Sequence, residues 1–209
     1  MNVVLIGYRA TGKSTVGRIL SAKLKIAFWD TDALVEKSMA MPIKEMVALH
    51  GWDFFRAKER ETIEYLTQKE DGVIATGGGV VLFRENVKLL KQNVDLLKQE
   101  GVIIWLNAPL QDIIDRLKKD ARNGAIRPQF TSSNIVQETI DIMRQRLPLY
   151  EREADHTVDT LNKNAPQVAE EIYQYLRKSE NLAKRAFLPI LSKPLLLIFS
   201  RSNNNEPQL

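Results

Sequence analysis

Near its start the chain carries a glycine-bounded loop between an apolar segment and a helical pattern, an order that few folds accommodate. Residues Val3–Ile6 are entirely apolar, and Gly7–Ser14 (GYRATGKS) follow them directly. Beyond the loop, apolar side chains recur at helical spacing on one face, at Val16, Ile19, Leu20 and Leu24. Strand, loop and helix in this order, with G-x-x-x-x-G-K-S in the loop, are typical of a P-loop.

The composition of this loop explains how it can bind phosphate. Gly7 and Gly12 permit backbone angles that a side chain disfavours, so the N–H groups between them can turn inward around an anion. The following helix adds unpaired N–H groups and the positive end of its dipole. Lys13 can then reach the β- and γ-phosphates, and the Ser14 hydroxyl can ligate Mg²⁺. The alternative is an accidental match to the bare pattern, which the flanking strand and helix disfavour.

Composition excludes several classes of function. The chain has 209 residues, enough for one domain or one domain with an appendage, and it has no cysteine and two histidines. Disulfides, thiolate catalysis and cysteine-based zinc sites are therefore excluded, and a histidine-built metal centre is disfavoured. The net charge of +4 arises from well-mixed basic and acidic residues, so we expect no nucleic acid partner. We find no signal peptide and no apolar run of about 18 residues, and we expect a cytoplasmic protein with no membrane partner.

A pair of acids follows the second apolar segment. Ile26–Trp29 is expected to form a buried strand, and Asp30 and Asp32 come at its end. Ligands gather at the carboxyl ends of strands in an open parallel sheet, which suits these acids to Mg²⁺ or to a substrate hydroxyl. Asp32 can equally be the N-cap of a helix over residues 33–38, and the sequence alone leaves both interpretations open. The apolar strand expected before Asn107 ends without an acid, so the acidic function falls to Asp30 and Asp32.

Two further features indicate a ligand other than the phosphate donor. The glycines Gly77–Gly79 follow an apolar strand expected at residues 73–76. A tight turn needs only one glycine, so three in a row favour a ligand against bare backbone, with a flexible linker as the alternative. On a helix expected over residues 52–69, Arg56 and Glu59 lie three apart and can pair, although helix charges more often form solvated surface pairs.

The segment 120–133 has no periodicity and contains Asn123-Gly124 and Arg127-Pro128. This is the form of a mobile lid, and Arg127 is its candidate functional residue, with a merely solvated arginine as the alternative.

Helical patterns are expected on both sides of this lid. They cover residues 84–100, 110–119, 134–150 and a final segment from residue 165, and a strand is expected at 156–159. After Ser179 the pattern breaks down. We therefore divide the chain into a domain at 1–178 and a C-terminal tail at 179–209 of unknown role.

Taken together, these motifs resemble the shikimate kinase family over roughly residues 2–178. The motifs that match stand in order: Gly7–Thr15 (GYRATGKST), Asp30-Thr31-Asp32, Phe55-Arg56 with Glu59, Gly77–Gly79, Arg127-Pro128, Arg146 with Pro148-Leu149-Tyr150, and Val158-Asp159-Thr160. The first is shared by many phosphotransferases, whereas the next three in this order are much more specific. The resemblance implies an α/β fold like that of nucleoside monophosphate kinases, with three layers, a five-stranded parallel sheet flanked by helices, and a mobile lid.

The resemblance also implies an activity and a set of site residues. The activity is transfer of the ATP γ-phosphate to the 3-hydroxyl of shikimate, with Mg²⁺ as cofactor, in the pathway to chorismate and the aromatic amino acids. ATP would contact Gly7, Ala10, Thr11, Gly12, Lys13, Ser14, Thr15, Arg116, Arg127 and Lys163. Shikimate would contact Asp32, Arg56, Gly77, Gly78, Gly79 and Arg146, with Glu59 holding Arg56 in place. Mg²⁺ would bind Ser14 and Asp30, and the catalytic residues would be Lys13, Asp32 and Arg127.

Two other functions stay open on the sequence alone. Another small-metabolite kinase of the same architecture, such as one for gluconate, explains the P-loop but not the two arginines together with the triple glycine. A catalytically silent regulator that binds a partner through the tail would be expected to have lost some of the catalytic residues.

We expect ATP and shikimate as the partners and a monomer as the working form. We assign no function to the segment 84–101, which looks longer than is usual for the family.

Overall fold

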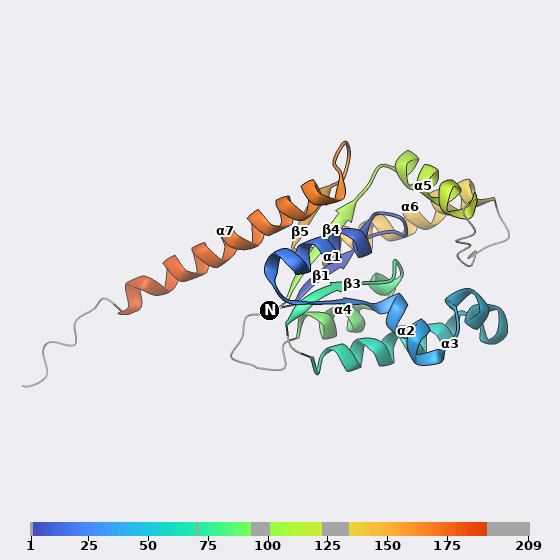
Figure 1. The fold of residues 1–209 in the computed structure, drawn as a ribbon, viewed down its shortest axis with the longest axis horizontal. Coiled ribbons are helices and arrows are strands. Elements are labelled where there is room, and N and C mark those ends of the chain that lie inside the picture. The colour runs from blue at the N-terminus through green and yellow to red at the C-terminus, as the bar shows by residue number, and fades with distance from the viewer. Residues whose placement is uncertain (1, 70, 93–100, 123–133, 192–209) are drawn as a thin grey trace, which may run out of the picture. The chain divides into compact units, whose positions relative to one another are not determined.

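The computed structural model describes residues 2–69, 71–92, 101–122 and 134–191 (Figure 1). The chain divides into two compact units, of which the first ends at Tyr173 and the second begins at Gln174. The described part of the second unit is the C-terminal portion of helix α7 (Ala165–Leu191). The boundary expected at residue 178 therefore falls inside a helix.

A five-stranded parallel sheet in the order β2-β3-β1-β4-β5 forms the centre of the first unit, as predicted. Its strands are β1 (Val3–Ile6), β2 (Ala27–Asp30), β3 (Gly72–Ala75), β4 (Val102–Asn107) and β5 (His156–Asp159). The carboxyl ends of parallel strands share one edge of the sheet, where ligands bind in open α/β folds. The P-loop after β1, the acids after β2 and the glycines after β3 are thereby brought to the same edge.

Helices cover both faces of the sheet (Figure 1). They are α1 (Lys13–Leu24), α2 (Thr31–Met39), α3 (Ile43–Leu66), α4 (Arg84–Lys91), α5 (Leu110–Arg122), α6 (Ile135–Glu153) and α7, with a 3₁₀ turn at Val80–Leu82. Val4 and Ile6 of β1 share a buried cluster with Ile63 of α3 and Ile142 of α6. Leu5 points to the other face, where its Cδ1 atom lies 3.3 Å from a Cβ built on Gly17 of α1. This alternation along β1 produces the predicted three layers.

The strand β2 lies at the edge of the sheet, and the prediction of a buried strand there was wrong. Ala27 is exposed, and the other residues of β2 are half-buried. The cause is topological, because β3 lies between β1 and β2 although it comes later in the chain. The order of strands along a sequence does not determine their order in a parallel sheet.

The helix α6 continues through Pro148 to Glu153, past the expected end at Tyr150. A proline inside a helix removes one N–H group and leaves the carbonyl four residues earlier without its usual partner. Pro148 is exposed, so water can reach this part of the helix and the break is avoided. The helix α7 runs beyond Ser179, where the sequence pattern breaks down, to Leu191.

Two other expected boundaries also differ from the structure. The helix α4 ends at Lys91, and Gln92 is extended, so the continuous helix predicted over residues 84–100 is interrupted at Gln92; residues 93–100 lie outside the described residues. The first residues assigned to the lid, 120–122, belong to α5, and the remainder at 123–133 also lies outside the described residues. Among the helices described here, none has both the length and the apolar character needed to cross a membrane.

Candidate active site

Two cavities in the first unit share part of their walls. The larger, of about 510 Å³, is lined by the P-loop residues 10–16 and by residues that include Asp30, Thr76, Arg116, Thr160 and Lys163. The smaller, of about 220 Å³, is lined by residues that include Arg9, Trp52, Phe55, Arg56, Gly77, Gly79 and Arg146. Asp32 and Gly78 line both cavities. A group bound in one cavity can therefore meet a group bound in the other at these two residues.

The P-loop has the backbone that its sequence predicts. Gly7 has a φ of +141°, and a Cβ atom built there would lie 2.7 Å from the carbonyl oxygen of Leu106, so only glycine fits. Gly12, with a φ of +95°, is the N-cap of α1. The ammonium group of Lys13 donates to the carbonyl oxygens of Gly7 and Tyr8 at 2.8 Å each. These bonds hold the lysine at the loop, in the wall of the larger cavity.

Asp30 links the P-loop helix to the second strand. Its Oδ2 atom accepts a hydrogen bond from the Ser14 hydroxyl at 2.5 Å, and its Oδ1 atom accepts from the backbone N–H of Ala33 at 3.2 Å. Asp30 is thus the N-cap of α2, and the interpretation of Asp32 as the cap named the wrong residue. Asp32 lies in the first turn of α2, where it lines both cavities.

The donor set at Ser14 and Asp30 fits Mg²⁺ bound together with a nucleotide. Among the described residues, no group of three His, Cys, Asp or Glu side chains is placed to hold a metal by itself. Mg²⁺ is ordinarily held by one or two carboxylates together with substrate phosphates and water. A hydroxyl and a carboxylate beside a phosphate-binding loop match this pattern.

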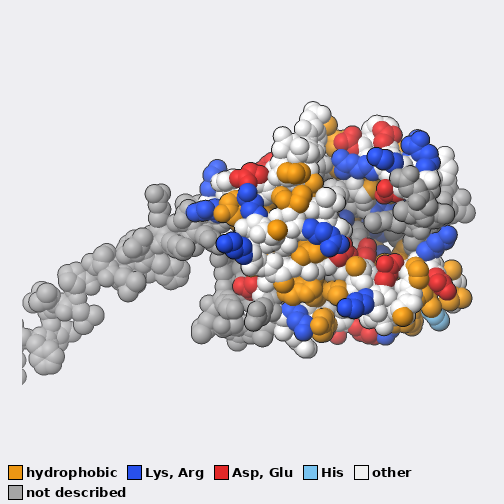
Figure 2. Space-filling model, viewed as in Figure 1, with side chains coloured by type: hydrophobic (Ala, Val, Ile, Leu, Met, Phe, Trp, Pro, Cys, Tyr) orange, Lys and Arg blue, Asp and Glu red, His pale blue; other side chains and the backbone are white. Residues whose placement is uncertain are grey.

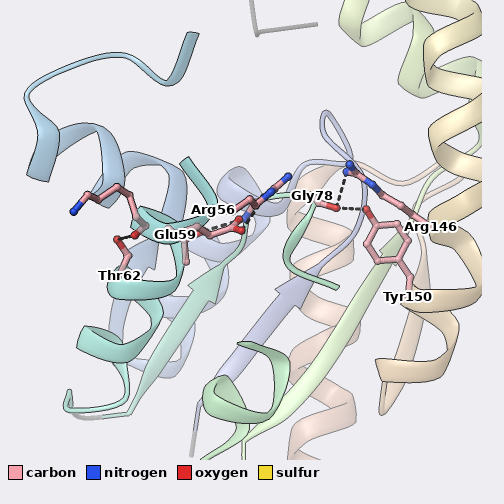
Figure 3. A network of polar contacts seen from close by, with 9 residues as sticks. Arg56, Glu59, Thr62, Gly78, Arg146 and Tyr150 are labelled. Carbon is pink, nitrogen blue, oxygen red and sulfur yellow. Dashed lines mark hydrogen bonds and ion pairs between the residues drawn. The ribbon is translucent and has the colours of Figure 1, made fainter. Parts of the chain in front are cut away.

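The guanidinium group of Arg56 is fixed in the wall of the smaller cavity (Figure 3). Its Nη1 atom donates to Glu59 Oε2 at 2.7 Å, and the Glu59 side chain is 1% exposed. The Cζ atom of Arg56 also lies 5.6 Å from the ring centre of Trp52 and 5.1 Å from that of Phe55. The predicted pairing of Arg56 with Glu59 is therefore present, and the pair is largely buried rather than solvated.

A second buried guanidinium group, that of Arg146, approaches Gly78 from α6 (Figure 3). Its Nη1 atom donates to the Gly78 carbonyl oxygen at 3.1 Å, and the Tyr150 hydroxyl donates to the same oxygen at 2.5 Å. Burial lowers the pKa of Arg146 from its usual value, because the charged form loses hydration. A cation kept in such a place favours an anionic ligand in the smaller cavity.

Side chains of the site closely approach Gly77 and Gly79, and the P-loop backbone approaches Gly78. A Cβ atom on Gly77 would lie 2.7 Å from both Asp32 Oδ1 and Glu59 Oε1, and one on Gly79 would lie 2.2 Å from Arg56 Nη2. A Cβ atom on Gly78 would lie 3.1 Å from the backbone nitrogen of Arg9 in the P-loop. The sequence suggested a ligand against bare backbone as the reason for the run. The structure adds a direct reason, which is the close approach of Asp32, Glu59 and Arg56.

The remaining nucleotide-site candidates lie around the larger cavity. Arg116 Nη1 donates to the carbonyl oxygen of Ala10 at 3.2 Å, and Lys163 Nζ pairs with Glu171 Oε2 at 2.6 Å. Thr11 and Thr15 of the loop line the same cavity. Arg127 lies outside the described residues. Charged side chains of both signs are mixed on the face of the described residues that Figure 2 shows.

The family model for shikimate kinase matches residues 9–177. The chain belongs to the shikimate kinase family. A shikimate kinase of Nitratidesulfovibrio vulgaris is 42% identical over 156 residues, which cover 75% of this chain and 85% of that relative. A shikimate kinase of Syntrophus aciditrophicus is 38% identical over 179 residues, which cover 82% and 88%.

Solved structures agree with the sequence relatives. A shikimate kinase from Acinetobacter baumannii in complex with shikimate superimposes with a TM-score of 0.75 and 30% sequence identity, over 85% of this chain and 93% of that chain. The predicted family is therefore confirmed, and so is the predicted fold class.

Some residues of the site had no role predicted from the sequence. Thr31 accepts a hydrogen bond from the Gly77 N–H at 3.0 Å and so ties the acids after β2 to the glycines. Arg9 forms a buried ion pair with Glu138 at the start of α6. The spacing of Trp52 could have indicated a place in the site, because Trp52 stands one helical turn before Arg56 on the same face. No sequence signal paired Arg9 with a residue so distant in the chain.

Proposed function

We infer that this chain transfers the γ-phosphate of ATP to the 3-hydroxyl of shikimate. This inference rests on one observation. Asp32 and Gly78 line both the cavity at the P-loop and the neighbouring cavity that contains two buried arginines. Shikimate is a carboxylate with three hydroxyl groups. Arg56 and Arg146 offer forked donors that match a carboxylate, and each charged hydrogen bond contributes about 1.5–3 kcal/mol.

Asp32 is the group that we propose to orient the attacking hydroxyl and to accept its proton. Phosphoryl transfer depends chiefly on positioning and on stabilisation of charge, so the location of Asp32 in both cavities is the property that matters. Glu59 keeps the guanidinium group of Arg56 in place through their ion pair.

The larger cavity is proposed to bind ATP. The P-loop N–H groups and Lys13 bind its phosphates, while Arg116 and Lys163 lie near the base. Ser14 and Asp30 would hold Mg²⁺, which neutralises charge on the phosphates when it is bound. Arg127 is proposed to reach the phosphates from the segment 123–133. Described residues of one chain line both cavities, so we propose that a monomer suffices for activity. We propose the cytoplasm as the compartment because it supplies ATP.

A coupled ADP assay with shikimate, quinate or gluconate as the acceptor tests this function. At fixed ATP and Mg²⁺ we expect ADP release to require shikimate and to be at least about a hundredfold slower with gluconate, whose open chain cannot present its hydroxyls as the ring does. Faster release with gluconate than with shikimate would overturn the assignment. Absence of release with every acceptor would favour the silent regulator instead.

Removal of the metal is expected to abolish the shikimate-dependent release of ADP. Excess EDTA should lower the rate by at least about a hundredfold, because the charge of the transferring phosphoryl group then lacks its counter-ion. Activity should return on addition of Mg²⁺ in excess of the chelator. An undiminished rate in EDTA would exclude Ser14 and Asp30 as a metal site that matters for the reaction.

The variant Gly79→Ala is expected to raise KM for shikimate by about tenfold or more, with KM for ATP within about twofold. The added Cβ atom would overlap Arg56 Nη2, and the flexible end of the arginine can move aside at the cost of about one charged hydrogen bond to the carboxylate. Initial rates at varied shikimate and varied ATP measure both constants. Equal rises in both constants would show a general disturbance and would contradict the placement of Arg56 at the acceptor.

A further inference from the structure

The carbonyl oxygen of Gly78 accepts two hydrogen bonds from one helix. Arg146 and Tyr150 are four residues apart on α6, so both side chains lie on the same face, and both donate to this oxygen (Figure 3). Arg146 is already needed in the smaller cavity, where it lines the wall. Tyr150 lines neither cavity, so its bond to Gly78 needs another explanation.

Tyr150 is a rigid donor. Its side chain is fully buried, and its ring stacks on Trp105 of β4, with 5.9 Å between the ring centres and an interplanar angle of 22°. Burial raises the pKa of the Tyr150 hydroxyl from its usual value, because the phenolate would lose hydration. The hydroxyl therefore keeps its proton at neutral pH and can donate to the Gly78 carbonyl oxygen.

Gly78 lies where a displacement would affect both cavities. It lines both cavities, and its Cα lies so close to the P-loop that a built Cβ atom is 3.4 Å from the carbonyl oxygen of Gly7. A shift of Gly78 would move the floor of the acceptor cavity relative to the loop that binds the phosphates. Misplacement of reacting groups by about 1 Å can cost a factor of about 10² in rate.

We propose that Tyr150 is a positioning residue for phosphoryl transfer, whose hydroxyl fixes the Gly78 carbonyl and with it the glycine segment against which the acceptor binds. The proposal rests on the proposed function, because it concerns the same acceptor cavity. Tyr150 touches neither substrate. It acts through Gly78, whose carbonyl oxygen is also the hydrogen-bond partner of Arg146.

The variant Tyr150→Phe removes the hydroxyl and retains the ring against Trp105. We expect KM for shikimate to rise about three- to tenfold, as for loss of one buried hydrogen bond, and kcat to fall by a similar factor. KM for ATP should stay within about twofold, because the P-loop contacts are untouched. The unfolding temperature should fall by less than about 4 °C, since Gly78 keeps its bond from Arg146.

Two controls separate positioning from packing. Tyr65→Phe makes the same chemical change on a half-exposed tyrosine of α3, and it should alter neither constant. Trp105→Phe weakens the ring stack but leaves the Tyr150 hydroxyl, so it should lower the unfolding temperature more than Tyr150→Phe does and raise KM for shikimate less. Trp52 lines the acceptor cavity, so its fluorescence gives the Kd for shikimate without nucleotide as a second readout.

The outcomes distinguish this inference from the function on which it rests. A selective rise in KM and Kd for shikimate in Tyr150→Phe supports the inference. Two outcomes in Tyr150→Phe would overturn this inference and leave the proposed function standing. One is an active enzyme with unchanged KM and Kd for shikimate. The other is an equal rise in KM for ATP and for shikimate, together with a loss of stability as large as that of Trp105→Phe. A wild-type chain without shikimate-dependent activity would overturn the proposed function and this inference together.

Discussion

Arg56→Ala is expected to lower kcat/KM for shikimate by about 10²–10⁴-fold and to leave ATP affinity within about twofold. The variant removes two parallel charged hydrogen bonds to the substrate carboxylate, each worth about 1.5–3 kcal/mol, and about 1.4 kcal/mol corresponds to tenfold. The cavity proposed for ATP has walls that do not include Arg56. Initial rates of ADP release at varied shikimate, together with a titration of ATP binding, measure the two effects.

This variant also disturbs the fold, and the disturbance needs its own control. Glu59 is 1% exposed in its side chain and loses its ionic partner when Arg56 is removed. Breaking a buried pair from one side costs about 3–5 kcal/mol, because a buried charge is left uncompensated. In the double variant Arg56→Ala/Glu59→Gln that charge is absent, so stability should recover while activity should not. Recovery of activity in the double variant would show that the single variant failed only through folding.

Asp32→Asn is expected to lower kcat by about 10²–10⁴-fold, with KM for both substrates changed by less than about threefold. The amide is nearly the same size as the carboxylate, so the close packing of Asp32 against Gly77 is retained. It cannot accept the proton of the attacking hydroxyl, and a positioned general base contributes about 10²–10⁴ in rate. A pre-steady-state measurement of ADP formation places the loss in the chemical step.

Asp53→Asn provides the matched control for this loss. Asp53 is exposed on α3 and lines neither cavity, so the same chemical change there should leave kcat and both KM values unchanged. A decrease of less than about fivefold in Asp32→Asn would contradict the role of Asp32 as the base.

Local sequence patterns were sufficient for most of the fold. The apolar runs at β1 and β4 and the helical periodicity of α1 predicted these elements because the signal lies within neighbouring residues. Gly51 shows the same principle, since its φ of +83° interrupts α3 directly before the helix that the sequence predicts from residue 52.

Predictions that depended on distant contacts were less accurate. The edge position of β2 depends on β3, which follows it by some 40 residues in the chain and intervenes between it and β1. The helix cap is Asp30 rather than Asp32, although propensity permits both, and the same carboxylate also accepts the hydrogen bond of Ser14 from a distant segment. Neither result follows from residue type and spacing alone.

The sequence by itself determined the phosphate-binding loop, the parallel sheet and the family of this protein. Each is encoded by short motifs whose residues are neighbours in the chain, and whose chemistry is the same wherever they occur. Only the tertiary structure decided that Asp32 and Gly78 form the shared wall of two cavities, and that Tyr150 holds a glycine 72 residues away. The physical reason is that parallel strands bring their carboxyl ends together from remote segments, so the contacts that we propose for the acceptor arise from packing rather than from sequence proximity.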